Sequence, residues 1–431
     1  MDAQALEEHL FRREAGRLVS ILTGLFGIQN LALAEDVVQD AFCRALETWK
    51  FHGVPENPSA WLLTTARNRA FDVLRRERTA SKYAPDLEQF LTSEWTMRPV
   101  IDEAFDAGGI NDVQLRMMFS CIHPKLPEET QLALVLHLLC GFAIEETAAA
   151  FLKKRGALER KLSRAKRTLA TSTELFELKG ARDVAARLPA VLRVIYLLFN
   201  EGYHGASPDA PIRRELCGEA MRLVELLLSN PLTASPATHA LAALMYFLAA
   251  RLSSRLDSEG HLLLLVDQDR TRWDADLIAE GRRQMELSAS GDELTPYHIE
   301  AAIAERHAAA KGLNDTDWAG IVSLYTTLMR LRPSPVVALN RAVAIAQRDG
   351  PARGLAEIEA MPERKRLAKY PFFFTAIGEF QLRLGRRAAA RQAFETALGL
   401  ARNPAERQFL GGRVHGCGDL SCNTAVPEER S

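Results

Sequence analysis

The stretch from Leu33 to Glu77 constrains the fold most, because two amphipathic helical patterns meet there at a clear boundary. In the first pattern, apolar residues recur at spacings of one, three and four, with acidic residues on another face. In the second, Asn57 suits an N-cap and Pro58 suits the first helical position. This second pattern also carries a polar stripe rich in arginine, made of Thr65, Asn68, Arg69, Asp72, Arg75 and Arg76. The stretch therefore predicts two helices, with one face suited to a protein partner and the other to phosphate.

The rest of the chain also has helical patterns. Residues 4–27 form an apolar stripe that Gly27 ends, and no strand-like alternation of any length follows Ala181. We predict an all-α protein with five parts. These are a small helical domain (1–78), a linker of aperiodic and mildly acidic sequence (79–110), a second small helical domain (111–170), a helical extension (181–412) and a flexible tail (413–431).

Composition excludes several classes of protein. A net charge of −1 means that any DNA binding must come from local basic patches. No apolar run approaches the roughly 20 residues that span a bilayer, and the N-terminus is acidic where a signal peptide would be basic and then apolar. We therefore expect a cytoplasmic protein with no membrane contact. Cys417 and Cys422 lack companion His or Cys ligands, so we expect no metal site there.

A basic patch lies in the second domain. A short helix from Ile144 to Leu152, a turn and a longer helix to Leu169 follow the helix-turn-helix pattern. Residues 153–167 hold eight Lys or Arg and a single Glu. A solvated helix face usually alternates charge signs, and this segment does not, so we favour DNA contact. The candidates for phosphate and base contacts are Lys153, Lys154, Arg155, Arg160, Ser163, Arg164 and Arg167.

These residues resemble the extracytoplasmic-function (ECF) sigma factors of bacterial RNA polymerase. The segment AEDVVQDAF is similar to the family's polymerase-binding helix, and NPSAWLLTTARNRAFDVLRRE is similar to its minus-ten promoter helix. Residues 151–166 resemble the minus-thirty-five-binding domain. Arg155 and Gly156 depart from that pattern, since an acidic residue and a better helix former are expected there.

The resemblance implies roles for particular residues. It implies that Asp36, Gln39 and Asp40 dock on core RNA polymerase. It also implies that the minus-ten element is engaged by Trp61, Asn68, Arg69, Asp72, Arg75 and Arg76. Trp61 has two interpretations, because it suits either the core or a loop, residues 50–57, that holds an extruded promoter base.

The extension has a weak internal period. Small and large residues occupy tetratricopeptide-like positions in the last unit, and preceding units follow at offsets of about 33 to 36 residues. We expect helical repeats from about residue 300, which present a surface to a regulatory protein.

Two other segments carry polar clusters. Residues 264–280 are rich in Asp and Arg, and Asn200, Glu201, Tyr203 and His204 end an apolar helix. Both could form a site, but we favour capping, ion pairs and surface roles, because metal-ligand spacing is missing. We expect no cofactor, no metal and no catalytic residue.

The sequence therefore favours a non-catalytic sigma factor whose partners are core RNA polymerase and promoter DNA. The alternative is a helix-turn-helix regulator with a repeat-based sensor domain that never binds the core enzyme.

Overall fold

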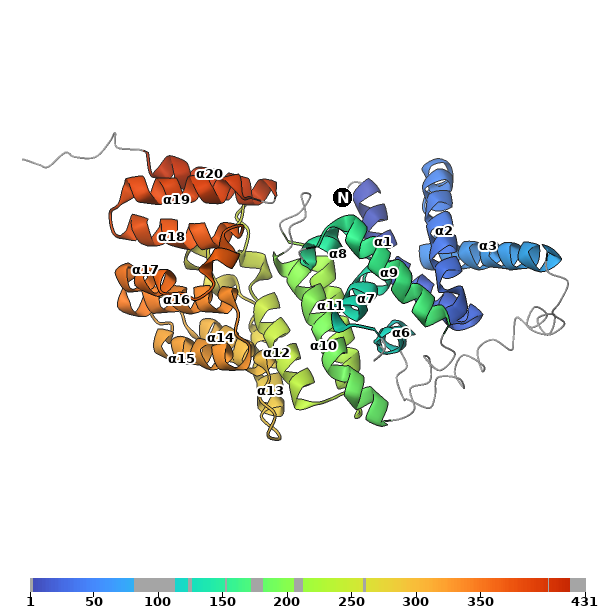
Figure 1. Cartoon of the computed structure of the whole chain (residues 1–431), viewed down its shortest axis with the longest axis horizontal. Coiled ribbons are helices and arrows are strands. Elements are labelled where there is room, and N and C mark those ends of the chain that lie inside the picture. Colours follow the sequence, from blue (N-terminus) through green and yellow to red (C-terminus); the bar gives the residue numbers. More distant parts are fainter. Residues whose placement is uncertain are drawn as a thin grey trace, which may run out of the picture. The chain divides into compact units, whose positions relative to one another are not determined.

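The computed structural model describes residues 3–80, 113–122, 126–151, 153–171, 181–204, 212–258, 261–401 and 403–418. All regular elements in these ranges are helices, with one isolated β-bridge between Leu256 and Leu262 (Figure 1). The predicted all-α class is confirmed. The chain divides into two compact units: a first unit of residues 1–198 and 222–234, and a second unit of residues 199–221 and 235–431.

The first unit begins with an N-terminal lobe of three long helices: α1 (Ala3–Phe26), α2 (Leu31–His52) and α3 (Pro58–Ala80). A short 3-10 helix, η1 (Ile28–Asn30), joins α1 to α2. Gly27 and Gly53 follow α1 and α2 with φ of 83° and 78°, a conformation that glycine adopts readily. Asn57 caps α3 as predicted, since its Oδ1 accepts a hydrogen bond of 3.0 Å from Ala60 N. The core of the lobe includes Leu18, Leu22, Val37, Val38, Ala41, Ala45, Leu62, Ala66 and Ala70.

A helix-turn-helix lobe follows in the same unit. Its helices are α6 (Val113–Cys121), α7 (Glu128–Leu139), α8 (Ile144–Ala150) and α9 (Arg155–Ala170). The predicted stripe on α9 is confirmed, because Leu158, Leu162, Ala165 and Leu169 are all buried. The linker predicted at residues 79–110 lies almost wholly outside the described residues, and the domain boundaries stay predictions.

The two lobes contact each other closely. A Cβ atom added to Gly16 in α1 would lie 1.9 Å from the carbonyl oxygen of Leu139 at the end of α7, so only glycine fits there. An ion pair also joins the lobes, because Lys166 Nζ in α9 lies 2.8 Å and 2.6 Å from the two carboxylate oxygens of Glu35 in α2. Both side chains are about one-fifth exposed, at 22% and 17%. The pair is therefore shielded from water more than a surface ion pair.

The extension begins with α10 (Ala181–His204) and α11 (Arg214–Leu228), each of which contains residues of both units. Their first-unit portions contact the helix-turn-helix lobe. Arg187 Nη1 donates a 2.9 Å hydrogen bond to the carbonyl of Phe119, and Arg222 Nη2 donates one of 3.2 Å to Gln114 Oε1. The start of the extension is therefore built into the first unit.

The second unit continues with α12 (Pro236–Ala249), α13 (Ala275–Ser288) and α14 (Pro296–Ala309). Between α12 and α13 lie three 3-10 turns, η3 (Leu252–Ser254), η4 (Leu265–Asp267) and η5 (Arg270–Arg272). Helix α12 is buried almost throughout and packs on α13 and α14. Among the described helices, none combines the length and apolar character that crossing a bilayer requires.

The last helices pack in succession as predicted for repeats: α15 (Trp318–Leu331), α16 (Pro335–Asp349), α17 (Pro351–Glu359), α18 (Pro371–Arg383), α19 (Arg387–Gly399) and α20 (Pro404–Gly416). A 3-10 turn, η6 (Arg364–Leu367), precedes α18. A Cβ on Gly378 would lie 2.6 Å from the buried Phe394 ring, which confirms that a small residue permits this close approach. We expected a flexible tail from residue 413, but helix α20 extends to Gly416. Its Arg413 pairs with Glu379 of α18, which stabilises this end of the helix.

Reversing one charge of the ion pair between the lobes should loosen their contact. Cys121 in α6 is a suitable reporter, because burial, with a smaller effect from Glu35, raises the pKa of its thiol to about 12. We expect Lys166→Glu to accelerate alkylation of Cys121 by iodoacetamide about tenfold or more, as measured by mass spectrometry, because two carboxylates would then face each other.

Exposed Cys43 serves as the internal standard for reagent activity. The double variant Glu35→Lys/Lys166→Glu should return to the wild-type rate. Lys161→Glu is the matched control, since Lys161 pairs with Glu129 inside the helix-turn-helix lobe. Equal rates in all four proteins would contradict the contact.

Candidate nucleic-acid interface

The outer face of α2 is acidic. Asp36, Gln39 and Asp40 are all exposed there, while Val37, Val38 and Ala41 are buried on the opposite face. The structure therefore brings the three predicted polymerase contacts onto one accessible helical surface.

Helix α3 presents the arginine-rich stripe. Leu62, Ala66 and Ala70 are buried at spacings of four, which turns the polar positions outward. The exposed candidates are Asn68, Asp72, Arg75 and Arg76, and Arg69 is half-buried. Four of the five polar candidates are thus open to solvent on one helix.

An ion pair links the two surfaces. Arg69 Nε lies 2.9 Å from Asp40 Oδ2, and the side chains are 40% and 52% exposed. The resemblance to ECF factors implied a polymerase contact for Asp40 and a DNA contact for Arg69, whereas the structure pairs the two side chains with each other. Exposed ion pairs contribute about 0–1 kcal/mol to stability, so this pair can break at little cost in free energy.

Trp61 lies at the edge of the core. It is half-buried, and its ring packs edge-on against buried Trp49 with centroids 5.5 Å apart. The packing agrees with the core interpretation, while its accessible part leaves contact with a base as a prediction.

Large apolar side chains near Trp61 in the sequence are exposed, with Phe51 at 79%, and Leu46 and Val54 at 48% each. By its spacing Leu46 was predicted to belong to the buried apolar stripe, so its exposure corrects that prediction, whereas Phe51 and Val54 lie within the predicted loop at residues 50–57 and were not singled out. The signal was a phenylalanine placed at the end of α2, beyond its apolar stripe.

Helix α9 presents its basic face to solvent. Lys153, Lys154, Arg155, Arg160, Ser163, Arg164 and Arg167 are all exposed, opposite the buried stripe of the helix. The preceding α8 completes the helix-turn-helix arrangement. All seven predicted contacts therefore lie at or near one accessible surface.

The seven candidates differ in their partners. Arg155 pairs with Glu145 and Glu159 at 2.5 Å and 2.8 Å, and hydrogen bonding to Glu159, then the Glu145 charge, raises the pKa of its guanidinium. Lys153 lies 3.6 Å from Glu129. Within the described part of the chain, the side chains of Lys154, Arg160, Arg164 and Arg167 have no hydrogen-bond or ion-pair partner. These last four are the cations most available to phosphate.

Gly156 departs from the family pattern without a steric need. An added Cβ would meet only Arg160 Nη1, at 3.7 Å, so the site has room for a side chain.

The Asp-rich segment forms caps and connections. Asp274 accepts hydrogen bonds from the backbone of Asp276 and Leu277, and Asp269 accepts one from Thr271. Arg270 Nη1 donates to the carbonyls of His307 and Ala310 at 2.8 Å and 2.9 Å. The interpretation as capping is confirmed at these positions. No group of three metal-ligating side chains occurs among the described residues.

The second polar cluster also has internal partners. Arg213 Nη2 lies 2.6 Å from Glu201 Oε1, and the Arg255 guanidinium lies 3.9 Å from the centroid of the Tyr203 ring. Burial lowers the pKa of Arg255. These contacts tie α10 to the segments that follow it in the second unit.

An exposed acidic helix, an exposed arginine-rich helix and a basic helix-turn-helix together define a protein of transcription initiation. Comparison with known families agrees. Residues 10–80 match sigma-70 region 2, residues 116–169 match sigma-70 region 4, and residues 187–289 match a family of unknown function, DUF6596.

Two known proteins are similar to the chain, and one of them is a sigma factor. RNA polymerase sigma factor CarQ of Myxococcus xanthus is 31% identical over 147 residues, which cover 34% of this chain and 77% of CarQ. An uncharacterized protein of Rhizobium meliloti (strain 1021) is 38% identical over 382 residues, 89% of each chain. No solved structure matches the chain. The chain belongs to the sigma-70 family of RNA polymerase sigma factors, in the ECF group, and carries a C-terminal helical extension.

The pairing pattern on α9 predicts unequal contributions to DNA binding. Arg164→Ala should weaken binding of the full-length protein to random-sequence duplex DNA and reduce the slope of log K against log[KCl] by about 0.9, the effect of one lost phosphate contact. Arg155→Ala should change the slope by less than half as much, because Glu145 and Glu159 already neutralise it. Fluorescence anisotropy across a KCl series measures both slopes. A larger effect of Arg155→Ala would contradict the assignment.

Proposed function

We propose that this protein binds core RNA polymerase, directs it to particular promoters and assists strand opening. The observation that carries the proposal is that the first unit exposes both an acidic surface on α2 and basic surfaces on α3 and α9. A regulator that used its helix-turn-helix alone would not need the first of these.

Each surface has a distinct task. Asp36, Gln39 and Asp40 dock on the polymerase, as the resemblance to ECF factors implies. The exposed cations of α9 bind the duplex at the minus-thirty-five element, through phosphates for position and base edges for sequence.

At the minus-ten element, α3 binds the melted strand. Arg75 and Arg76 neutralise phosphates, while Asn68 and the accessible part of Trp61 contact unpaired bases. Opening a base pair costs a few kcal/mol, which these contacts offset. The bond-forming chemistry belongs to the core enzyme.

The Asp40–Arg69 pair connects these events. Because both side chains are accessible to solvent, at 40% for Arg69 and 52% for Asp40, a polymerase group that binds Asp40 would release Arg69 toward DNA. Docking on the core enzyme would then favour engagement of the minus-ten element.

Promoter binding requires the two lobes to separate. By their names the two promoter elements lie roughly 25 base pairs apart, or about 85 Å at 3.4 Å per base pair. The lobes instead touch through Gly16 and through the Glu35–Lys166 pair. Residues 79–110 have a contour length of about 105 Å at roughly 3.3 Å per residue, enough to join lobes placed on both elements. The described arrangement is therefore a closed state in this proposal.

We also propose that the extension regulates the sigma domains, in place of a separate regulator. Supporting this, Arg187 and Arg222 of α10 and α11 bind groups of the helix-turn-helix lobe. Any change that shifts these helices would thus reach the lobe that reads DNA.

Binding to sigma-free core RNA polymerase tests the proposed function. We expect the full-length protein to bind, and the variant Asp36→Ala/Asp40→Ala to lose at least about tenfold in affinity, because charged pairs at interfaces are strongly coupled. Biolayer interferometry with immobilised core enzyme gives the affinities.

The matched control is Asp276→Ala/Glu293→Ala, which removes the same charge from exposed positions in the second unit. Its affinity should stay within twofold of the wild type. Failure of the full-length protein to bind core enzyme, together with sequence-specific binding to duplex DNA, would favour the helix-turn-helix regulator instead.

A further inference from the structure

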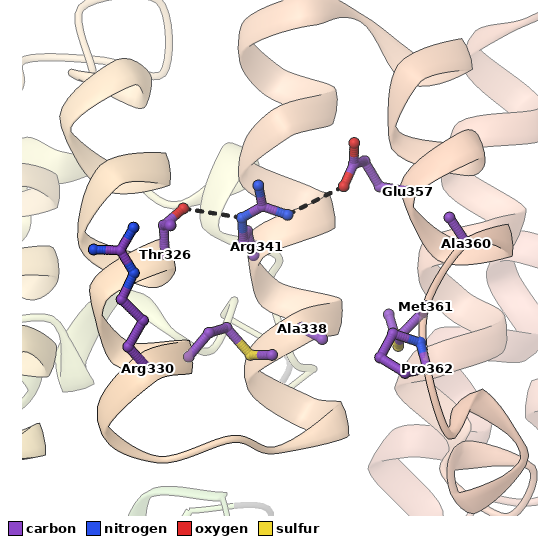
Figure 2. A pocket seen from close by; sticks show the side chains of 9 residues that line it. Thr326, Arg330, Ala338, Arg341, Glu357, Ala360, Met361 and Pro362 are labelled. Atoms are coloured by element: carbon purple, nitrogen blue, oxygen red, sulfur yellow. Dashed lines mark hydrogen bonds and ion pairs between the residues drawn. The ribbon is translucent and has the colours of Figure 1, made fainter.

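The repeats contain a pocket that the sigma function does not use. It lies on α15, α16 and the end of α17 and has a volume of about 380 Å³, within the range of sites that bind small molecules or side chains (Figure 2). Its lining consists of Thr326, Met329, Arg330, Ala338, Arg341, Glu357, Ala360, Met361 and Pro362.

Arg341 is fixed in the middle of this pocket. Its Nε donates a 3.0 Å hydrogen bond to Thr326 Oγ1, and its Nη1 donates one of 3.1 Å to Glu357 Oε2, as Figure 2 shows. Glu357 also accepts a 2.8 Å hydrogen bond from Arg353 Nη2, so two guanidinium groups share its single charge. Glu357 is the only carboxylate of the lining, and two guanidinium groups more than balance its negative charge.

Arg330 supplies a second cation without an internal partner. Within the described part of the chain its side chain makes no hydrogen bond or ion pair, and it is exposed beside Thr326 at the pocket. The pocket thus carries a net positive charge. Because no internal partner competes for Arg330, a carboxylate from a ligand can form a charge-assisted hydrogen bond with it.

The remaining lining is apolar and adaptable. Met329, Ala338, Met361 and Pro362 provide this surface, and methionine fits side chains of varied shape. A run of nucleic acid fits poorly, because it carries a charge on every phosphate and the pocket offers two cations in a largely apolar lining. An acidic side chain beside an apolar one matches both the charge and the lining.

We propose that this pocket binds an acidic peptide segment of a partner protein. A carboxylate of the segment pairs with Arg330 and with the outward part of Arg341, and a neighbouring apolar side chain packs on Met329 and Met361. Only the consequence of binding, a signal from the partner to the sigma domains, rests on the proposed regulatory role of the extension. The binding itself is independent of polymerase and promoter.

Selection of peptides on the immobilised full-length protein tests the proposal. From a random phage-displayed library we expect enrichment of peptides with Asp or Glu next to Leu, Ile, Val or Phe. A labelled copy of the best peptide should bind about tenfold more weakly to Arg330→Gln, the loss of one charge-assisted hydrogen bond. Replacing its acidic residue by the amide should cause a similar loss for the wild-type protein.

Arg332→Gln is the matched control, since Arg332 is exposed, two residues away and outside the pocket. Its affinity should stay within twofold of the wild type. Circular dichroism checks the fold, which Arg330 supports through no internal pair. Lack of enrichment, selected peptides without acidic residues, or unchanged binding to Arg330→Gln would overturn the proposal. So would an oligonucleotide of random sequence that binds through Arg330.

Because the readout is peptide binding, it separates this proposal from the proposed function. A protein that binds core enzyme but selects no acidic peptide would retain the sigma function and lose the docking site.

Discussion

The contact between the two lobes of the first unit is the constraint on which the rest depends. Gly16 allows α1 to touch the carbonyl of Leu139, and the half-buried Glu35–Lys166 pair adds a directional link. The contribution of a half-buried ion pair to stability lies between that of an exposed pair, which is small, and that of a buried pair, which costs about 3–5 kcal/mol to break. Both contacts stabilise the proposed closed state. In the proposed function, docking on polymerase and binding to promoter phosphates together offset the cost of opening it.

Local features of the fold could be predicted from the sequence. Helical periodicity located the stripes of α2, α3 and α9, and Asn57 and Gly27 marked helix ends through capping chemistry that acts within a few residues. The small residue Gly378 indicated close helix packing in the repeats. The candidate surfaces followed as well, because most of the polar residues opposite a buried stripe are exposed, although Arg69 is half-buried.

Partners distant in the sequence could not be predicted. Glu35 and Lys166 lie 131 residues apart, and Asp40 and Arg69 lie 29 apart, so both pairs depend on how helices pack rather than on helical spacing. The same limit hid the pairing of Arg155 with Glu145, which makes it a weaker DNA candidate than its neighbour Arg164. It also concealed that parts of α10 and α11 share a unit with the helix-turn-helix lobe, although the extension reads as separate from the sigma domains in sequence.

Reconstituted transcription tests the sigma-factor account most directly. Sigma-free core RNA polymerase, the full-length protein and sheared chromosomal DNA from the source organism would be combined, and RNA 5′ ends sequenced. The account predicts discrete start sites that need the protein and share sequence elements roughly 10 and 35 base pairs upstream. About 85 Å of duplex separates these two elements. Start sites that are the same with and without the protein, under conditions where it binds the core enzyme, would contradict it.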